Sequence, residues 1–118
     1  MKKENPIVDK SKLFAIRIVN LYKHLVQNRS EYVMSKQLLR SGTSIGANVR
    51  EAVFAQTRAD FNSKMYIALK EAGESAYWIE LLESTEYLTE KQAKSILDDC
   101  NELTRILSSI TKTVRETK

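Results

Sequence analysis

The sequence predicts an all-α protein, an antiparallel up-down-up-down four-helix bundle that forms one domain over residues 1–118. Only three Gly and one Pro interrupt the chain, and this composition favours a few long helices over many short strands. Apolar residues recur every three or four positions over long segments, which is the period of an amphipathic helix. Short polar stretches separate these segments, so consecutive helices are expected to run antiparallel.

The first helix is expected at about residues 10–28, where Phe14, Ile18, Leu21 and Leu25 form an apolar stripe. Residues 1–30 contain seven basic and two acidic groups, so this helix is the basic one. Its basic side chains are interpreted either as a solvated surface or as a patch that contacts phosphate groups. The candidate nucleic-acid contacts are Lys10, Lys12, Arg17, Lys23 and Arg29.

The second helix, at about residues 32–55, is the unusual one, because it contains two glycines. Its apolar positions follow a helical period: Met34, Leu38, Ile45, Val49 and Ala52. Gly42 and Gly46 each destabilise a helix interior by about 1 kcal/mol relative to alanine. We therefore expect them to let a neighbouring helix approach closely.

A polar stripe runs beside that apolar face at the same helical spacing. A buried polar group without a partner costs about 1–3 kcal/mol, so side chains of this stripe that face inward must bond one another. Two interpretations stay open: an interhelical network that fixes the register of the helices, or a site for a ligand or nucleic acid. The predicted network consists of Arg40, Ser44, Asn48 and Glu51 with Glu71 and Glu74 of the next helix.

The third helix is expected at about residues 58–84, after Thr57 and Asp60, which resemble a capping box. One side carries Met65, Ala68 and Ala72 and is suited to close packing. The other side is also apolar, and a small bundle has no middle layer to bury it. We interpret it as an oligomer interface, the alternative being aromatic rings that lie flat on the surface. The predicted interface residues are Tyr66, Ile67, Tyr77, Trp78 and Leu81.

The fourth helix is expected at about residues 89–116, because Thr89 and Gln92 form a complete capping-box pattern. Its apolar residues alternate in steps of three and four, as in a bundle seam. These residues are Ala93, Ile96, Cys100, Leu103, Leu107, Ile110 and Val114.

Catalytic, metal-binding and cofactor-binding sites are not expected. The only histidine, His24, lacks the preceding Glu of a Glu-x-x-His metal pair, and Cys100 falls on a core position where a thiol is inert. No glycine loop follows a strand, as phosphate-binding motifs require. A single cysteine, the absence of an apolar signal core and the lack of a span of about eighteen apolar residues favour a cytoplasmic protein without a membrane association.

A family resemblance rests on residues 37–52, Arg58, Asp60, Phe61, residues 67–72, Glu74 and residues 77–82. Its core motif is an arginine followed by Ser-Ile-x-Ala-Asn and a glutamate, here Arg40, Ser44, Ile45, Ala47, Asn48 and Glu51. Nearly the whole chain resembles the bacterial four-helix-bundle proteins encoded in 23S rRNA intervening sequences.

The resemblance implies an up-down bundle that assembles into a homopentamer and has no established enzymatic activity. The accessory variability proteins of diversity-generating retroelements are more distantly similar, and that group binds nucleic acid and a reverse transcriptase through a strongly basic surface. This chain differs from that group in its net charge of only +4 and in its acidic third helix.

Two functional hypotheses follow. In the first, the protein is a non-enzymatic homo-oligomeric scaffold whose basic groups contact RNA or DNA. In the second, it is a protein–protein adaptor that does not bind nucleic acid. An enzyme or small-ligand protein would depend on Arg40, Asn48 and Glu51 alone, and it is the least supported interpretation.

Overall fold

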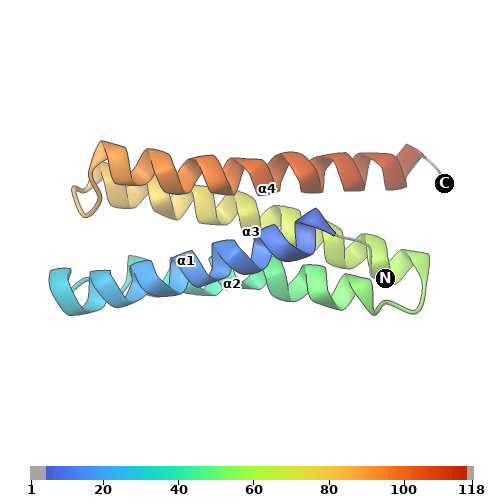
Figure 1. Ribbon diagram of the computed structural model, residues 1–118, viewed down its shortest axis with the longest axis horizontal. Helices are drawn as coiled ribbons and strands as arrows, with labels where there is room; N and C mark the ends of the chain where they lie inside the picture. The colour runs from blue at the N-terminus through green and yellow to red at the C-terminus, as the bar shows by residue number, and fades with distance from the viewer. Residues whose placement is uncertain (1–4, 117–118) are drawn as a thin grey trace.

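The computed structural model describes residues 5–116, with side chains to residue 113. The fold is an all-α four-helix bundle, as predicted, and no strand occurs in the described residues. The chain runs up and down the bundle, so that residues 5 and 116 lie at the same end of the molecule (Figure 1). The four helices are α1 (Pro6–Arg29), α2 (Met34–Val53), α3 (Arg58–Ser84) and α4 (Glu90–Glu116).

Helix α1 begins at Pro6, four residues before the predicted start. Proline suits the first turn of a helix, because its φ angle is already helical and its missing N–H would have no partner there. Helix α2 is shorter than the predicted segment of residues 32–55 at both ends. The predicted seam residue Val114 lies outside the described side chains.

One apolar core runs between the helices, and α2 lies against both α1 and α3. Gly42 shapes the first of these contacts: a Cβ atom there would lie 2.9 Å from Ile18 Cγ1 and 3.0 Å from Ile18 Cγ2. Gly46 lies one turn further along, where a Cβ would be 3.4 Å from the Ser11 carbonyl oxygen. The neighbouring helix for which the two glycines make room is therefore α1.

The contact between α2 and α3 is also built from small residues. The hydroxyl oxygens of Ser41 and Ser75 are both fully buried and lie 2.9 Å apart in a hydrogen bond. Ser75 also lies 2.9 Å from the Glu71 carbonyl of its own helix, to which it donates when Ser41 supplies the proton of the other bond. This buried pair is satisfied and holds the two helix backbones close together.

Glu31, in the loop before α2, caps the start of that helix. Its carboxylate accepts hydrogen bonds from the backbone N–H groups of Val33, Met34 and Ser35 at 3.1, 3.0 and 2.6 Å. Burial alone would raise the pKa of Glu31, but these N–H donors outweigh it and lower the pKa below its ordinary value. The carboxylate thus satisfies three donors that every helix start leaves open.

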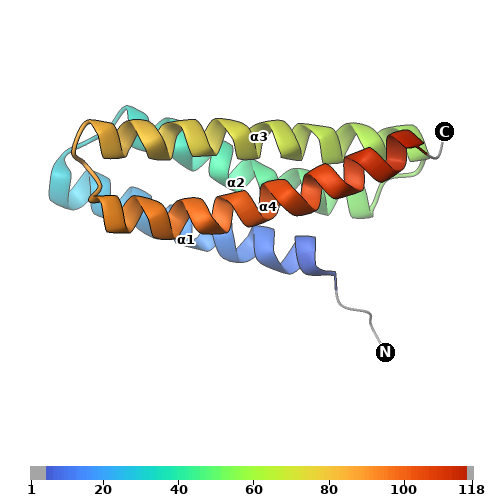
Figure 2. The same ribbon diagram turned by 90° about the horizontal axis from the view of Figure 1, so that it is seen from above.

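Helices α1 and α4 close the bundle and approach each other less than the other neighbouring pairs do. From above, the two helices cross at an angle (Figure 2). Ion pairs span this seam: Lys10 Nζ lies 2.8 Å from Glu102 Oε2, and Arg17 Nη1 lies 2.7 Å from Asp99 Oδ2. Surface ion pairs therefore help to close this seam.

We predict that Gly42→Ala destabilises the protein by about 1–3 kcal/mol, because the rigid, buried Ile18 cannot make room for the methyl group. Gly46→Ala is the matched control. It adds an ordinary contact and should be neutral or stabilising by up to about 1 kcal/mol through helix propensity. Urea unfolding followed by circular dichroism at one protein concentration measures both, and equal effects at the two glycines would contradict the packing described.

We predict that Glu31→Gln lowers the free energy of unfolding by about 1–2 kcal/mol at pH 7. Since folding lowers the pKa of Glu31, its stabilisation is present above the ordinary glutamate pKa and is lost as the pH falls through the folded value. The difference between variant and wild type should therefore shrink below about pH 4. The exposed Glu80→Gln is the control, and a difference that does not shrink at all as the pH falls below the ordinary glutamate pKa would refute the cap.

Candidate functional site

The predicted polar network is centred on Arg40, whose side chain reaches from α2 to α3. Arg40 Nη2 lies 2.6 Å from Glu74 Oε2, and its Nη1 lies 3.9 Å from Glu71 Oε1. Glu74 Oε2 also accepts a hydrogen bond of 3.0 Å from the indole N–H of Trp78. The structure thus brings three of the six predicted network residues together and adds Trp78 to them.

The other three predicted members behave differently. The Ser44 hydroxyl donates to the Arg40 carbonyl, and the Asn48 amide donates to the Ser44 carbonyl, so both bond to their own helix. Glu51 reaches α3 separately, with Glu51 Oε1 3.6 Å from Lys64 Nζ. The stripe therefore ties α2 to α3 at its two ends but not in its middle.

The chemistry available to this stripe is limited. The Arg40 side chain is 54% exposed, and ion pairs at such a surface contribute at most about 1 kcal/mol. Glu71 Oε1 is buried without a hydrogen-bond partner in the described structure, and only the distant Arg40 guanidinium offsets its charge. The arrangement fixes α2 against α3, and it presents charged and amide groups rather than a nucleophile beside a base.

Three of the five predicted nucleic-acid contacts are used within the protein. Lys10 and Arg17 pair with α4 as described, and Arg17 also donates to the Ser95 hydroxyl at 2.6 Å. Arg29 donates to the carbonyls of Tyr87 and Glu86 at 2.9 and 3.2 Å and lies over the Tyr87 ring. These cations hold α1 to α4 and to the loop before α4.

Lys12 and Lys23, the remaining two, are exposed and form no ion pair within the described residues. The five predicted contacts therefore do not form one continuous basic surface.

Charge in the folded protein separates by end as well as by helix. In the half where α1 begins, residues 5–17, 44–71 and 103–113 carry nine basic and four acidic side chains. In the other half, residues 18–43 and 72–102 carry six basic and nine acidic side chains. This gives +5 in one half and −3 in the other among the described side chains. The separation arises because antiparallel packing places segments distant in sequence side by side (Figure 1).

The predicted oligomer face on α3 is partly exposed. Tyr66, Ile67 and Tyr77 are 44%, 36% and 55% exposed, whereas Trp78 and Leu81 are half-buried. Trp78 packs against the core, and the Tyr77 and Trp78 rings meet edge to face with their centroids 5.1 Å apart. The exposed part of the predicted face thus consists of the first three residues.

Gly73 lies on this same face, four residues before Tyr77 and seven after Tyr66. It is exposed, and a Cβ atom added to it would meet no atom within 4 Å. Packing inside this chain therefore does not explain this glycine, in contrast to Gly42.

Cys100 is a core residue. Burial raises the pKa of its thiol to about 12, with the nearby charges of Asp99 and Glu80 adding to the shift. The thiol donates to the Ala72 carbonyl at 3.3 Å and stays protonated at neutral pH. A thiol in this state is a poor nucleophile and a poor metal ligand.

In the described part of the chain, no group of three His, Cys, Asp or Glu side chains gathers in a way that could hold a metal ion. None of the helices described there combines the length and apolarity needed to cross a lipid bilayer.

Comparison with known proteins identifies the family. The sequence profile of the 23S rRNA-intervening sequence protein family matches residues 3–109. The chain belongs to this family. A crystal structure of an S23 ribosomal protein family member from Bacteroides thetaiotaomicron VPI-5482, described as a protein of unknown function, is 61% identical, covers 90% of this chain and 98% of its own, and superposes with a TM-score of 0.89. No curated protein matches the chain.

Residues of the core motif lie in three different surroundings in α2. Ile45 is fully buried in the core, Arg40 and Glu51 reach towards α3, and Ala47 is exposed. Most of the motif thus makes contacts within the protein. The side that carries Ala47 lines a cleft between α1 and α2.

Proposed function

We propose that this protein is a non-enzymatic homo-oligomeric scaffold whose basic end binds nucleic acid. The pentamer implied by the family resemblance is the assembly that we propose. The single observation that supports assembly is Gly73 on the exposed apolar face of α3. The observation that favours nucleic acid is the excess of basic side chains in one half of the bundle.

The proposal of assembly rests on the destabilising effect of a glycine in the interior of helix α3. Glycine in a helix interior destabilises it by about 1 kcal/mol relative to alanine. At Gly42 close packing offsets this, but around Gly73 the protomer leaves open space. Backbone from another molecule could approach Gly73 between the exposed rings of Tyr66 and Tyr77. A second copy of this chain is the occupant we propose, because exposed aromatic residues of this kind are enriched in interfaces.

The proposal of nucleic-acid binding rests on unpaired cations. Six of the nine basic residues in the basic half form no ion pair within the described residues: Lys12, Arg50, Arg58, Lys70, Arg105 and Lys112. Unpaired surface cations are the groups that phosphate contacts require. A closed ring would repeat this basic half around one rim and would concentrate the positive potential there.

We predict that Gly73→Ala weakens self-association even though it raises the helix propensity of α3. The added methyl group blocks the proposed close approach of the second copy. Native mass spectrometry at micromolar concentration should show wild type as a multiple of 13.5 kDa and the variant shifted towards 13.5 kDa.

Tyr77→Ala should act in the same direction, because it removes a ring from the proposed interface. Tyr32→Ala, an equally exposed aromatic residue in the loop before α2, is the control and should leave the mass unchanged. A monomeric wild type, or an unchanged mass for both α3 variants, would remove the proposed interface.

We predict salt-sensitive binding of nucleic acid. A fluorescein-labelled 20-nucleotide RNA and a duplex DNA of equal length are titrated by fluorescence anisotropy. Binding should weaken about tenfold or more between 50 and 200 mM salt, as two or more phosphate contacts require. Arg105→Gln in the basic half should weaken binding about threefold, whereas Lys36→Gln in the other half should have little effect. Absence of binding below about 100 μM at 50 mM salt would leave the protein–protein adaptor as the remaining function.

A further inference from the structure

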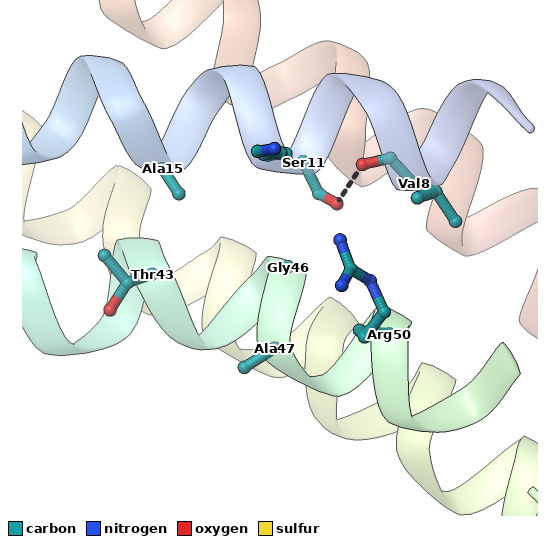
Figure 3. A pocket seen from close by; sticks show the side chains of 8 residues that line it. Val8, Ser11, Ala15, Thr43, Gly46, Ala47 and Arg50 are labelled. Atoms are coloured by element: carbon teal, nitrogen blue, oxygen red, sulfur yellow. Dashed lines mark hydrogen bonds between the residues drawn. The ribbon is translucent and has the colours of Figure 1, made fainter. Parts of the chain in front are cut away.

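A cleft of about 260 Å³ lies between α1 and α2 in the basic half of the bundle. It exists because the side chains that face each other there are small. Ser11 and Ala15 come from α1, and Gly46 and Ala47 come from α2 (Figure 3). Gly46 lets its own backbone approach Ser11, and the small neighbours leave the space beside this contact open.

Two cations line this cleft, Lys12 from α1 and Arg50 from α2, and no carboxylate does. Both side chains are exposed, and neither forms an ion pair within the described residues. Lys10, Arg17 and Lys64, which lie in the same half, each have a carboxylate partner. The cations left unpaired at this cleft are thus available to a ligand from outside.

The two hydroxyl groups that line the cleft already donate their hydrogen bonds to backbone carbonyls of their own helices. The Ser11 hydroxyl donates to the Val8 carbonyl, and the Thr43 hydroxyl donates to the Leu39 carbonyl. Figure 3 shows the Arg50 guanidinium extending into the space between the two helices, below the bond from Ser11 to Val8. The N–H groups offered to a ligand are therefore those of cations, which select an anion.

We propose that this cleft binds one phosphate group, with Arg50 as a bidentate donor and Lys12 as a second positive charge. A guanidinium matches two oxygens of a tetrahedral phosphate, and an ammonium group can neutralise a third. The volume exceeds that of one phosphate and leaves room for the adjoining sugar. This inference rests on the proposed function, and in that setting the phosphate is a backbone phosphate of the bound nucleic acid.

The test uses the full chain, the same labelled RNA and four variants. Arg50→Gln should weaken binding about tenfold and reduce the dependence of log K on log salt by about one contact. Arg58→Gln removes the same charge in the same half but outside the cleft, and it should weaken binding no more than about threefold. Arg50→Lys keeps the charge but loses the planar fork, so it should weaken binding at least threefold.

Ala47→Leu completes the set, because it narrows the cleft without changing any charge. Ala47 is exposed, so the larger side chain leaves the core intact. It should weaken RNA binding at least threefold. If Ala47→Leu binds as wild type does, or if Arg50→Gln and Arg58→Gln weaken binding equally, a diffuse positive field explains the binding and the cleft site is wrong.

Pyrophosphate, titrated calorimetrically at low salt, separates this inference from the proposed function. If RNA fails to bind but pyrophosphate binds wild type and not Arg50→Gln, the nucleic-acid function is wrong and the phosphate site stands, with a small phosphorylated ligand. If neither probe binds, both proposals are overturned. If RNA binds with the variant pattern described above, both are supported.

Discussion

The close approach of α2 to both of its neighbours is the constraint on which the rest of the bundle depends. On one side Gly42 leaves room for Ile18 of α1, and on the other Ser41 and Ser75 bring α2 against α3. Short distances between helix backbones require small residues at the contacts, and α2 supplies them on two sides. The polar stripe, the cleft and the ion pairs to α3 all occur at positions that this packing sets.

The contacts between the helices also differ in what holds them together. Where α2 packs tightly, small buried residues hold the helices together, and where α1 meets α4, surface ion pairs do so. The basic residues of α1 that the sequence offers as candidate nucleic-acid contacts therefore divide into two groups. Lys10 and Arg17 close the bundle, whereas Lys12 faces the opposite neighbour, α2, and stays available. Helical position, rather than residue type, separates the two groups.

The sequence predicts the number of helices because apolar periodicity and caps are local signals. Thr89 and Gln92 form both bonds of the predicted capping box, at 2.9 and 3.1 Å. The predicted start of α1, at about residue 10, is four residues too late, because the apolar stripe used to find the helix begins only at Phe14. The sequence does not reveal Glu31 as a cap, because it precedes α2 inside a loop, where only the folded backbone brings three N–H groups to its carboxylate.

The candidate sites were less predictable than the fold, because they depend on which partner each side chain finds. Spacing places Ser44 and Asn48 beside Arg40, but it does not reveal that both bond their own helix instead of α3. Nor does spacing bring Arg50 to Lys12, since these residues meet only when α1 and α2 pack together. The open space around Gly73 is also visible only in the folded structure, because it depends on which residues pack nearby in three dimensions.

The division of charge between the two halves gives the protein a permanent dipole along its 46 Å axis. Antiparallel helices cancel most of their own macrodipoles, so this dipole comes from the side chains. In the field of a polyanion it produces a torque that turns the molecule before any contact forms. Rotation during diffusion thus selects the end of the bundle that arrives first, and added salt removes this selection over distances beyond about 10 Å.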